Sequence, residues 1–221
     1  MANVDAAEAP IGLRARKKQQ TREHIAETAR TLFAQRGFEQ VTVAEIARAA
    51  DVSQQTVFNY FPTKEDLVYW QLGSFEERLL ATIREREAGE SALSAFRRFL
   101  LSQRGLLGRS DPEARERLTA LTRAISESPA LLAREQQILA RYTASLAELL
   151  AAEQGADPAD VEPWVAANAM IGVHRSLLAY TRRGVLEGSP QARLARDVAE
   201  QAERAFALLE QGLADYAVPR T

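Results

Sequence analysis

Apolar residues near the start of the chain recur at the spacing of an amphipathic helix. Ile25, Ala29, Leu32 and Phe33 stand at i, i+4, i+7 and i+8, so they share one helical face. Gly37 follows at the position where a helix commonly ends. The pattern therefore predicts a first helix whose apolar face must be covered by the segments that follow.

Those segments contain closely spaced helix starts. Thr42 and Glu45 fit a capping box, in which a hydroxyl and a carboxylate each satisfy a free backbone N–H, so a helix is predicted to begin at Val43. Ser53 can cap a second helix, and Asp51 belongs to the short turn between the two. Two short helices joined in this way are typical of a helix-turn-helix.

The second short helix is limited at both ends, because Ser53 caps its start and Pro62 cannot continue it. Thr63 and Asp66 then repeat the capping-box pattern and predict the next helix. Val57 and Phe61 lie four residues apart, so we expect both to face the core. The opposite face is polar, with Gln54, Gln55, Thr56, Asn59 and Tyr60.

Amide and hydroxyl side chains of this kind can donate to phosphates or bind base edges, and Gln and Asn can read adenine through two hydrogen bonds. A short, capped helix rich in such groups predicts a DNA-reading element that docks in the major groove. The alternative is an ordinary helix surface that faces only solvent.

The rest of the chain has no stretch of period-two alternation, so it is predicted to be helical. Four helix starts carry a capping residue followed by proline: Asp111-Pro112, Ser128-Pro129, Asp157-Pro158 and Ser189-Pro190. With glycine as the stop signal, the predicted helices are 64–87, 91–104, 112–126, 130–153, 158–182 and 190–216.

The predicted fold is therefore all-α, with about nine helices when the first three are included. We expect a disordered lead over residues 1–13 and a three-helix helix-turn-helix DNA-binding domain over 14–63. A second, larger helical domain is expected over 64–221.

Composition narrows the class of protein. The 221 residues are 46% hydrophobic, which is enough for a substantial core. No apolar run approaches the roughly 18 residues of a membrane span, and the N-terminus lacks the pattern of a secretory signal. We therefore expect a soluble cytoplasmic protein without a membrane partner. The absence of cysteine excludes disulfides and thiolate chemistry.

Charge is distributed unevenly between the two predicted domains. From Ile11 to Lys64 there are nine Lys or Arg and five acidic residues, a balance of +4 against a total of −2. A basic N-terminal module is consistent with phosphate binding. The candidates before the first helix are four cations that could form an arm on DNA or remain a solvated tail: Arg14, Arg16, Lys17 and Lys18.

The last two predicted helices have more apolar surface than the core of one monomer can bury. From Trp164 to Tyr180 apolar side chains point in several directions, and the 190–216 helix adds a stripe from Leu194 to Leu213. An isologous homodimer built from these helices is expected, with a larger monomeric core as the alternative. A reader of two-fold symmetric DNA also requires two modules.

At this point the sequence resembles the TetR family of transcriptional regulators. The resemblance extends from Thr21 to Leu67 and rests on a few short motifs: Leu32-Phe33, Gly37-Phe38, Val41-Thr42-Val43, Ile46-Ala47, Val52-Ser53, Thr56, Tyr60-Phe61 and Lys64-Glu65. It implies a homodimeric repressor that leaves a palindromic operator in double-stranded DNA when a small-molecule effector binds the C-terminal domain.

Carried over residue by residue, the resemblance implies phosphate contacts and base contacts. Thr42, Tyr60 and Lys64 are the phosphate candidates, and Ser53 belongs to the same DNA-contacting set. The base-edge candidates are Gln54, Gln55, Thr56 and Asn59. Two positions depart from the family pattern, since Asp51 and Gln55 each stand where glycine is common; Asp tolerates the left-handed backbone that such a turn needs.

No catalytic or metal-binding constellation is visible, so we expect neither an enzyme nor a cofactor. The candidates for an effector pocket are large or polar side chains of the body: Trp70, Phe75, Phe96, Phe99, Arg123, Tyr142, Trp164, Met170 and His174. Rival readings are a helical small-molecule carrier or enzyme, and a DNA-binding activator or architectural protein. Salt-dependent binding to a palindromic duplex distinguishes the first rival from a regulator.

Overall fold

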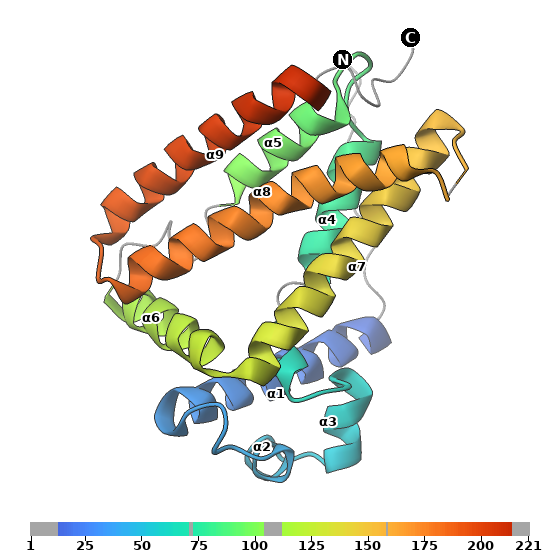
Figure 1. Ribbon diagram of the computed structural model, residues 1–221. Coiled ribbons are helices and arrows are strands. Elements are labelled where there is room, and N and C mark those ends of the chain that lie inside the picture. Colours follow the sequence, from blue (N-terminus) through green and yellow to red (C-terminus); the bar gives the residue numbers. More distant parts are fainter. Residues whose placement is uncertain (1–12, 71–72, 104–111, 158, 214–221) are drawn as a thin grey trace, which may run out of the picture. The chain divides into compact units, whose positions relative to one another are not determined.

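The computed structural model describes residues 13–70, 73–103, 112–157 and 159–213, and its regular elements are helices (Figure 1). Across those ranges it contains nine α-helices, one 3-10 turn and no strand. The prediction of an all-α fold is therefore confirmed. The chain divides into two compact units that meet in sequence between Trp70 and Gln71.

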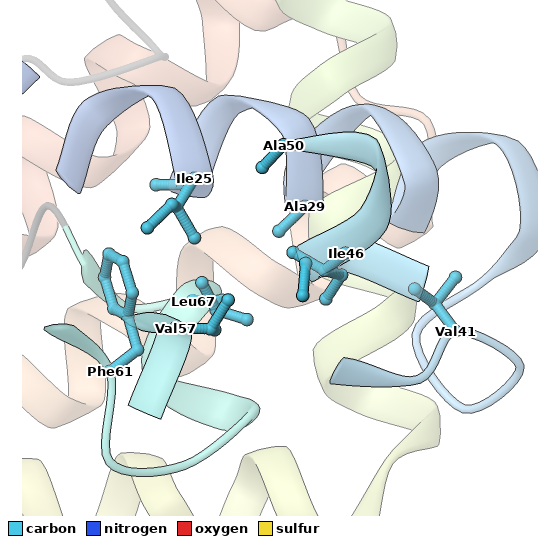
Figure 2. Close-up of a cluster of buried hydrophobic side chains, with 10 residues drawn as sticks. Ile25, Ala29, Val41, Ile46, Ala50, Val57, Phe61 and Leu67 are labelled. Atoms are coloured by element: carbon cyan, nitrogen blue, oxygen red, sulfur yellow. The ribbon is translucent and has the colours of Figure 1, made fainter. Parts of the chain in front are cut away.

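The first unit consists of α1 (Leu13–Arg36), α2 (Val43–Ala49), α3 (Gln54–Tyr60) and the 3-10 turn η1 (Glu65–Leu67). One buried apolar cluster joins these elements (Figure 2), with Ile25, Ala26, Ala29, Val41, Ile46, Ala47, Ala50, Val57, Phe61 and Leu67. Helices of seven residues are marginal in isolation, so packing in this shared cluster is what holds α2 and α3 in place, with α2 against α1 and α3 against α2.

The turn between α2 and α3 has the backbone expected from its sequence. Asp51 has φ +54°, the one positive φ among the described non-glycine residues. Its left-handed conformation lets the Val52 N–H donate to the Ala47 carbonyl at 2.9 Å. Asp is among the few residues that adopt this region at modest cost, and the prediction that it preserves the turn is confirmed.

The predicted helix over 64–87 is wrong in its first part. Thr63 and Asp66 form the expected capping box, with the Thr63 N–H donating to the Asp66 carboxylate at 3.0 Å. The box begins only η1, and α4 (Gly73–Arg84) is a separate helix. Leu67 is buried in the first unit's core, so the chain turns there instead of continuing as one helix. The unit thus ends later than the predicted boundary at residue 63.

The second unit contains α4, α5 (Ala92–Ser102), α6 (Pro112–Glu127), α7 (Pro129–Gln154), α8 (Val161–Leu186) and α9 (Gln191–Leu213). Helix α8 packs against both α7 and α9, and α5 packs against α4 and α9 (Figure 1). Gly184 lets α8 approach α9 closely, because a Cβ there would lie 2.4 Å from the Leu194 Cδ1 atom. The predicted helices from 91 onward are all present, with bounds shifted by a few residues. The predicted end of the last helix, at 216, lies outside the described residues.

Two of the predicted proline-marked starts can be compared in detail. Ser128 caps α7 as predicted, since its side chain accepts from the Leu131 N–H and Pro129 is the first helical residue. The start at Asp157-Pro158 is wrong: α8 begins at Val161 after Asp160. The Asp157 carboxylate instead accepts from the Ala159 N–H at 2.8 Å and closes a turn before the helix.

Pro163 lies in the first turn of α8, where a missing N–H removes no helical hydrogen bond. It therefore requires no kink. None of the described helices is long and apolar enough to cross a membrane.

Candidate nucleic-acid interface and effector site

The start of α2 is held by a complete capping box. The Thr42 side chain accepts from the Glu45 N–H at 3.3 Å, and the Glu45 carboxylate accepts from the Thr42 N–H at 2.8 Å. Arg36 at the end of α1 pairs with the same carboxylate at 2.8 Å. These contacts, the Thr42 backbone N–H first and Arg36 second, lower the pKa of Glu45 to about 2.

Helix α3 is fixed at its start by Ser53 and at its end by Phe61. The Ser53 Oγ accepts from the Thr56 N–H at 2.9 Å, and the Thr56 hydroxyl lies 2.8 Å from the same oxygen. The Phe61 N–H donates to the Val57 carbonyl at 2.8 Å, after which the backbone becomes extended. Both predicted limits of the helix are present, so its direction is set by the core of the unit.

The polar face of α3 is accessible. Gln54, Gln55 and Asn59 are exposed, and Thr56 and Tyr60 are half-buried. The Gln55 amide nitrogen donates to the Asn59 Oδ1 at 3.0 Å, one helical turn away. This contact places two amides side by side. Together they offer donors and acceptors that can pair with those of a base edge.

Phe58 is the residue on this helix that the sequence reasoning missed. Its side chain is 42% exposed, whereas the other apolar residue inside α3, Val57, is buried. The missed signal was available in the spacing, because a residue directly after a core position points away from that core. An exposed ring beside Gln55 and Asn59 adds an apolar group to the polar face.

Thr42, Tyr60 and Lys64, the three phosphate candidates, differ in how free their polar atoms are. The Thr42 hydroxyl already donates to the Glu45 carboxylate at 2.8 Å, so its proton serves the cap in this structure. Lys64 lies with its Nζ 4.1 Å from the centroid of the Phe38 ring, and burial lowers its pKa. Tyr60 is half-buried beside the core cluster.

The four cations that were expected to form an arm before the first helix belong to that helix instead. Arg14, Arg16, Lys17 and Lys18 all fall within α1, which begins at Leu13, and all four side chains are exposed. As helical residues they cannot follow a minor groove as an extended strand would. Residues 1–12, the rest of the predicted lead, lie outside the described residues.

Four of the nine effector-pocket candidates meet in the second unit. Phe75 of α4 stacks on Tyr142 of α7 with centroids 5.3 Å apart and on His174 of α8 with centroids 4.8 Å apart. Phe99 of α5 meets the edge of the same ring at 5.1 Å. We call these four residues the aromatic cluster. Each comes from a different helix, although they are far apart in sequence.

Burial changes the proton affinity of two members of the aromatic cluster. Desolvation lowers the pKa of His174 to about 4, so its imidazole is neutral near pH 7. Desolvation also raises the pKa of Tyr142, whose hydroxyl stays protonated. The cluster is thus an uncharged site with two polar groups.

The other candidates do not join the aromatic cluster. Phe96 and Met170 are fully buried, with Phe96 packed edge-on against Phe206 of α9. Arg123 is exposed on α6. Trp70 packs on the core of the first unit, with the Arg30 guanidinium over its ring.

Trp164 lines a separate open groove of about 240 Å³ between α7 and α8. Its polar rim is formed by Gln136, Asn168 and Arg175, and its floor includes Leu139 and Ile171. Within the described ranges, no three His, Asp or Glu side chains gather in a way that could hold a metal ion.

Comparisons with known proteins agree with this division of the chain. A family model described as bacterial regulatory proteins, tetR family, matches residues 25–69, and one described as the MftR C-terminal domain matches residues 90–214. The second match alone covers more than half of the chain. The chain belongs to the TetR family.

Two relatives of this TetR-family protein are regulators. The HTH-type transcriptional regulator TcmR of Streptomyces glaucescens is 32% identical over 151 residues, which cover 66% of each chain. MftR of Mycobacterium tuberculosis, described as a mycofactocin biosynthesis transcriptional regulator, is 30% identical over 165 residues, covering 72% of this chain and 78% of MftR.

Among solved structures, GusR of Salmonella enterica matches with a TM-score of 0.49 and 25% identity, over 88% of this chain and 96% of GusR. By its family-model matches and its two relatives, the TetR-family protein is a transcriptional regulator, a class of protein that is not enzymatic.

The capping box of α2 predicts a specific acid sensitivity for this TetR-family protein. The folded-state pKa of Glu45 lies below its ordinary value of 4.5, so its stabilising contribution is complete above that pH and is lost as pH falls toward about 2. In Glu45→Gln this contribution should be absent. The unfolding temperatures of wild type and variant should therefore differ most above pH 5 and converge toward pH 2. A difference that does not change with pH would contradict the role given to the carboxylate.

Proposed function

We propose that this TetR-family protein represses transcription by binding a palindromic operator as a homodimer, and that a small-molecule effector releases it. The observation that carries the proposal is the exposed, amide-rich face of α3, a helix fixed at both ends by Ser53 and Phe61. Such a helix can enter a major groove without losing its own hydrogen bonds. A soluble regulator of this kind acts in the cytoplasm, where its operator is.

Base reading is assigned to the exposed residues of α3, namely Gln54, Gln55 and Asn59, with Thr56 beside them. The paired Gln55 and Asn59 amides offer donors and acceptors that suit adenine or a purine step. The Ser53 and Thr56 hydroxyls share a hydrogen bond at the start of the helix, where both can approach the DNA backbone. Phe58 adds an apolar contact of the type that recognises the methyl group of thymine.

Phosphate binding is assigned to residues around this helix. Lys64 is the best placed cation, because a bound phosphate would offset the cost of its partial burial against Phe38. Tyr60 is the last residue of α3, and Thr42 caps the start of α2, where it would share its hydroxyl between Glu45 and DNA. The exposed cations Arg14, Arg16, Lys17 and Lys18 extend the positive surface along α1. These contacts set affinity and register, while α3 sets sequence preference.

The homodimer is supported by an exposed stripe on α8. One face of α8 carries residues that recur every three or four positions and are each exposed or half-exposed: Val161, Val165, Asn168, Gly172, Arg175, Ala179, Arg183 and Leu186. Val165 is 54% exposed, and on α9 Leu208 is 72% exposed. A seven-residue repeat of this kind is the seam of paired helices, and the small residues in its middle permit a close approach.

The effector site is proposed at the aromatic cluster, with the neutral His174 imidazole as its polar group. Phe75, on the first turns of α4, contacts all three other members, so a ligand inserted there would displace it. Release from DNA then requires that the ligand bind more tightly to the conformation that cannot engage the operator. The chemistry that suits the site is an uncharged, largely apolar molecule with one hydrogen-bonding group.

The function is tested by selecting duplexes from a random pool with the purified full-length protein. An inverted repeat with half-site centres separated by one helical turn, or a whole number of turns, is expected because two α3 helices must enter grooves on one face. Enrichment of a single unrepeated site would argue against the dimer. If no duplex is enriched even at low salt, the proposed function is wrong.

Phe58 predicts a dependence of binding on thymine methyl groups. Replacing one contacted thymine of the selected operator by deoxyuridine should weaken wild-type binding about fourfold, from ~0.8 kcal/mol per buried carbon group. Phe58→Ala should bind the two duplexes equally, and deoxyuridine outside the half-sites should change neither protein. Titrations by fluorescence anisotropy give the four affinities. Equal methyl dependence in wild type and variant would exclude Phe58 as the reader.

The α8 stripe predicts how dimerisation can be broken. Val165→Glu places a carboxylate at an exposed apolar position of the proposed seam, where pairing would bury it without a partner, so the variant should be monomeric at micromolar concentration. Ala152→Glu introduces the same charge at an exposed position of α7 outside the stripe and should leave the dimer intact. Sedimentation measures both masses. A dimeric Val165→Glu protein would place the interface elsewhere.

A further inference from the structure

Arg22 of α1 lies against the aromatic ring that follows the end of α3. Its guanidinium carbon lies 5.5 Å from the centroid of the Phe61 ring, and Phe61 is the residue at which α3 ends. In Figure 2 the Phe61 ring lies near Ile25, which follows Arg22 by three residues on α1 and so lies close to the same face. The Phe61 ring thus contacts the guanidinium of Arg22 at the edge of the core.

The side chain of Arg22 is incompletely satisfied. Its Nε is buried and has no hydrogen-bond partner, and Arg22 itself is only half-exposed. In the described part of the chain, the ion pairs of α1 arginines are those of Arg30 and Arg36, and none involves Arg22. Leaving a buried donor of a charged group unpaired costs free energy that a suitably placed anion would recover.

Arg30, two turns further along α1, shows what a purely structural arginine looks like in this unit. Its guanidinium also lies over an aromatic ring, 6.0 Å from the centroid of Trp70. Unlike Arg22, it is neutralised by Glu27 at 2.9 Å. Arg36 is likewise paired, with Glu45. Arg22 therefore has a ring contact like that of Arg30, but it has no carboxylate in the place that Glu27 takes beside Arg30.

The face of α1 that carries Arg22 changes character along the helix. Ala29, Ala26 and Ile25 are buried in the core, and the side chains at successive steps of four before Ala26 are Arg22, Lys18 and Arg14. Lys18 and Arg14 are exposed. The core-facing stripe therefore becomes cationic where it passes the core, and Arg22 is the first cation of that series.

We propose that Arg22 binds a backbone phosphate of duplex DNA, held in position by the Phe61 ring. The proposal rests on the proposed DNA-binding function and adds a site that the sequence pattern did not indicate. A guanidinium can meet two phosphate oxygens with parallel N–H groups, and Nε is one of the donors in that geometry. A phosphate bound there would supply the missing acceptor and would fix α1 relative to the end of α3.

The test is the salt dependence of DNA binding by variants that keep the ring contact but lose the charge. Arg22→Gln and Arg22→Met should both reduce the slope of log K against log salt by about 0.9 for each protomer engaged. Arg30→Gln is the matched control and should leave the slope unchanged. Anisotropy titrations between roughly 50 and 200 mM salt provide the slopes, and thermal unfolding monitored by circular dichroism confirms that each variant is folded.

The sequence dependence gives a second readout. Loss of a phosphate contact should weaken binding to the selected operator and to a scrambled duplex by the same factor, because phosphates carry no sequence information. Folded Arg22 variants with the wild-type slope would overturn the proposal, whatever their affinity, since a merely structural arginine changes stability without changing the number of phosphates neutralised. Wild-type protein that binds no duplex would instead refute the proposed function itself.

Discussion

The packing of α3 into the buried cluster that it shares with α1 and α2 is the constraint on which the DNA-binding unit depends. A helix of seven residues is not stable alone, and here its two core residues, Val57 and Phe61, are buried in a cluster that α1 completes. Ser53 fixes its start and the extended backbone at Phe61 fixes its end. Because the ends and one face are fixed, the remaining face presents its amides in one orientation, and recognition of a groove requires no ordering of the helix on binding.

The same unit uses its charges in two ways. Arg36 and Glu45 are paired across the α1–α2 junction and serve the fold, as do Arg30 and Glu27 on α1. Lys64 lies on the Phe38 ring and Arg22 on the Phe61 ring, and neither forms an ion pair in the described part of the chain. A cation that lies on an aromatic ring and forms no ion pair can still bind an anion. The second unit has a different organisation, with uncharged side chains of four helices meeting around Phe75.

The elements set by local chemistry could be predicted from the sequence, whereas those set by tertiary contacts could not. The caps at Thr42, Ser53 and Ser128 satisfy backbone groups within three residues, so their patterns were sufficient. The break after Leu67 could not be foreseen, because burial of that side chain in the first core ends the turn. The meeting of Phe75 with His174 joins helices a hundred residues apart, and periodicity alone carries no information on such pairs.

Footprinting of the bound operator with hydroxyl radicals, combined with methylation protection of its purines, examines the central claim most directly. Two capped α3 helices carried by a two-fold symmetric dimer should protect two major-groove segments on one face of the duplex. The segment centres should lie about 34–36 Å apart or at a multiple of that distance. Protection confined to the backbone, with every guanine N7 in the major groove still open to methylation, would contradict the assignment of α3 as the reader.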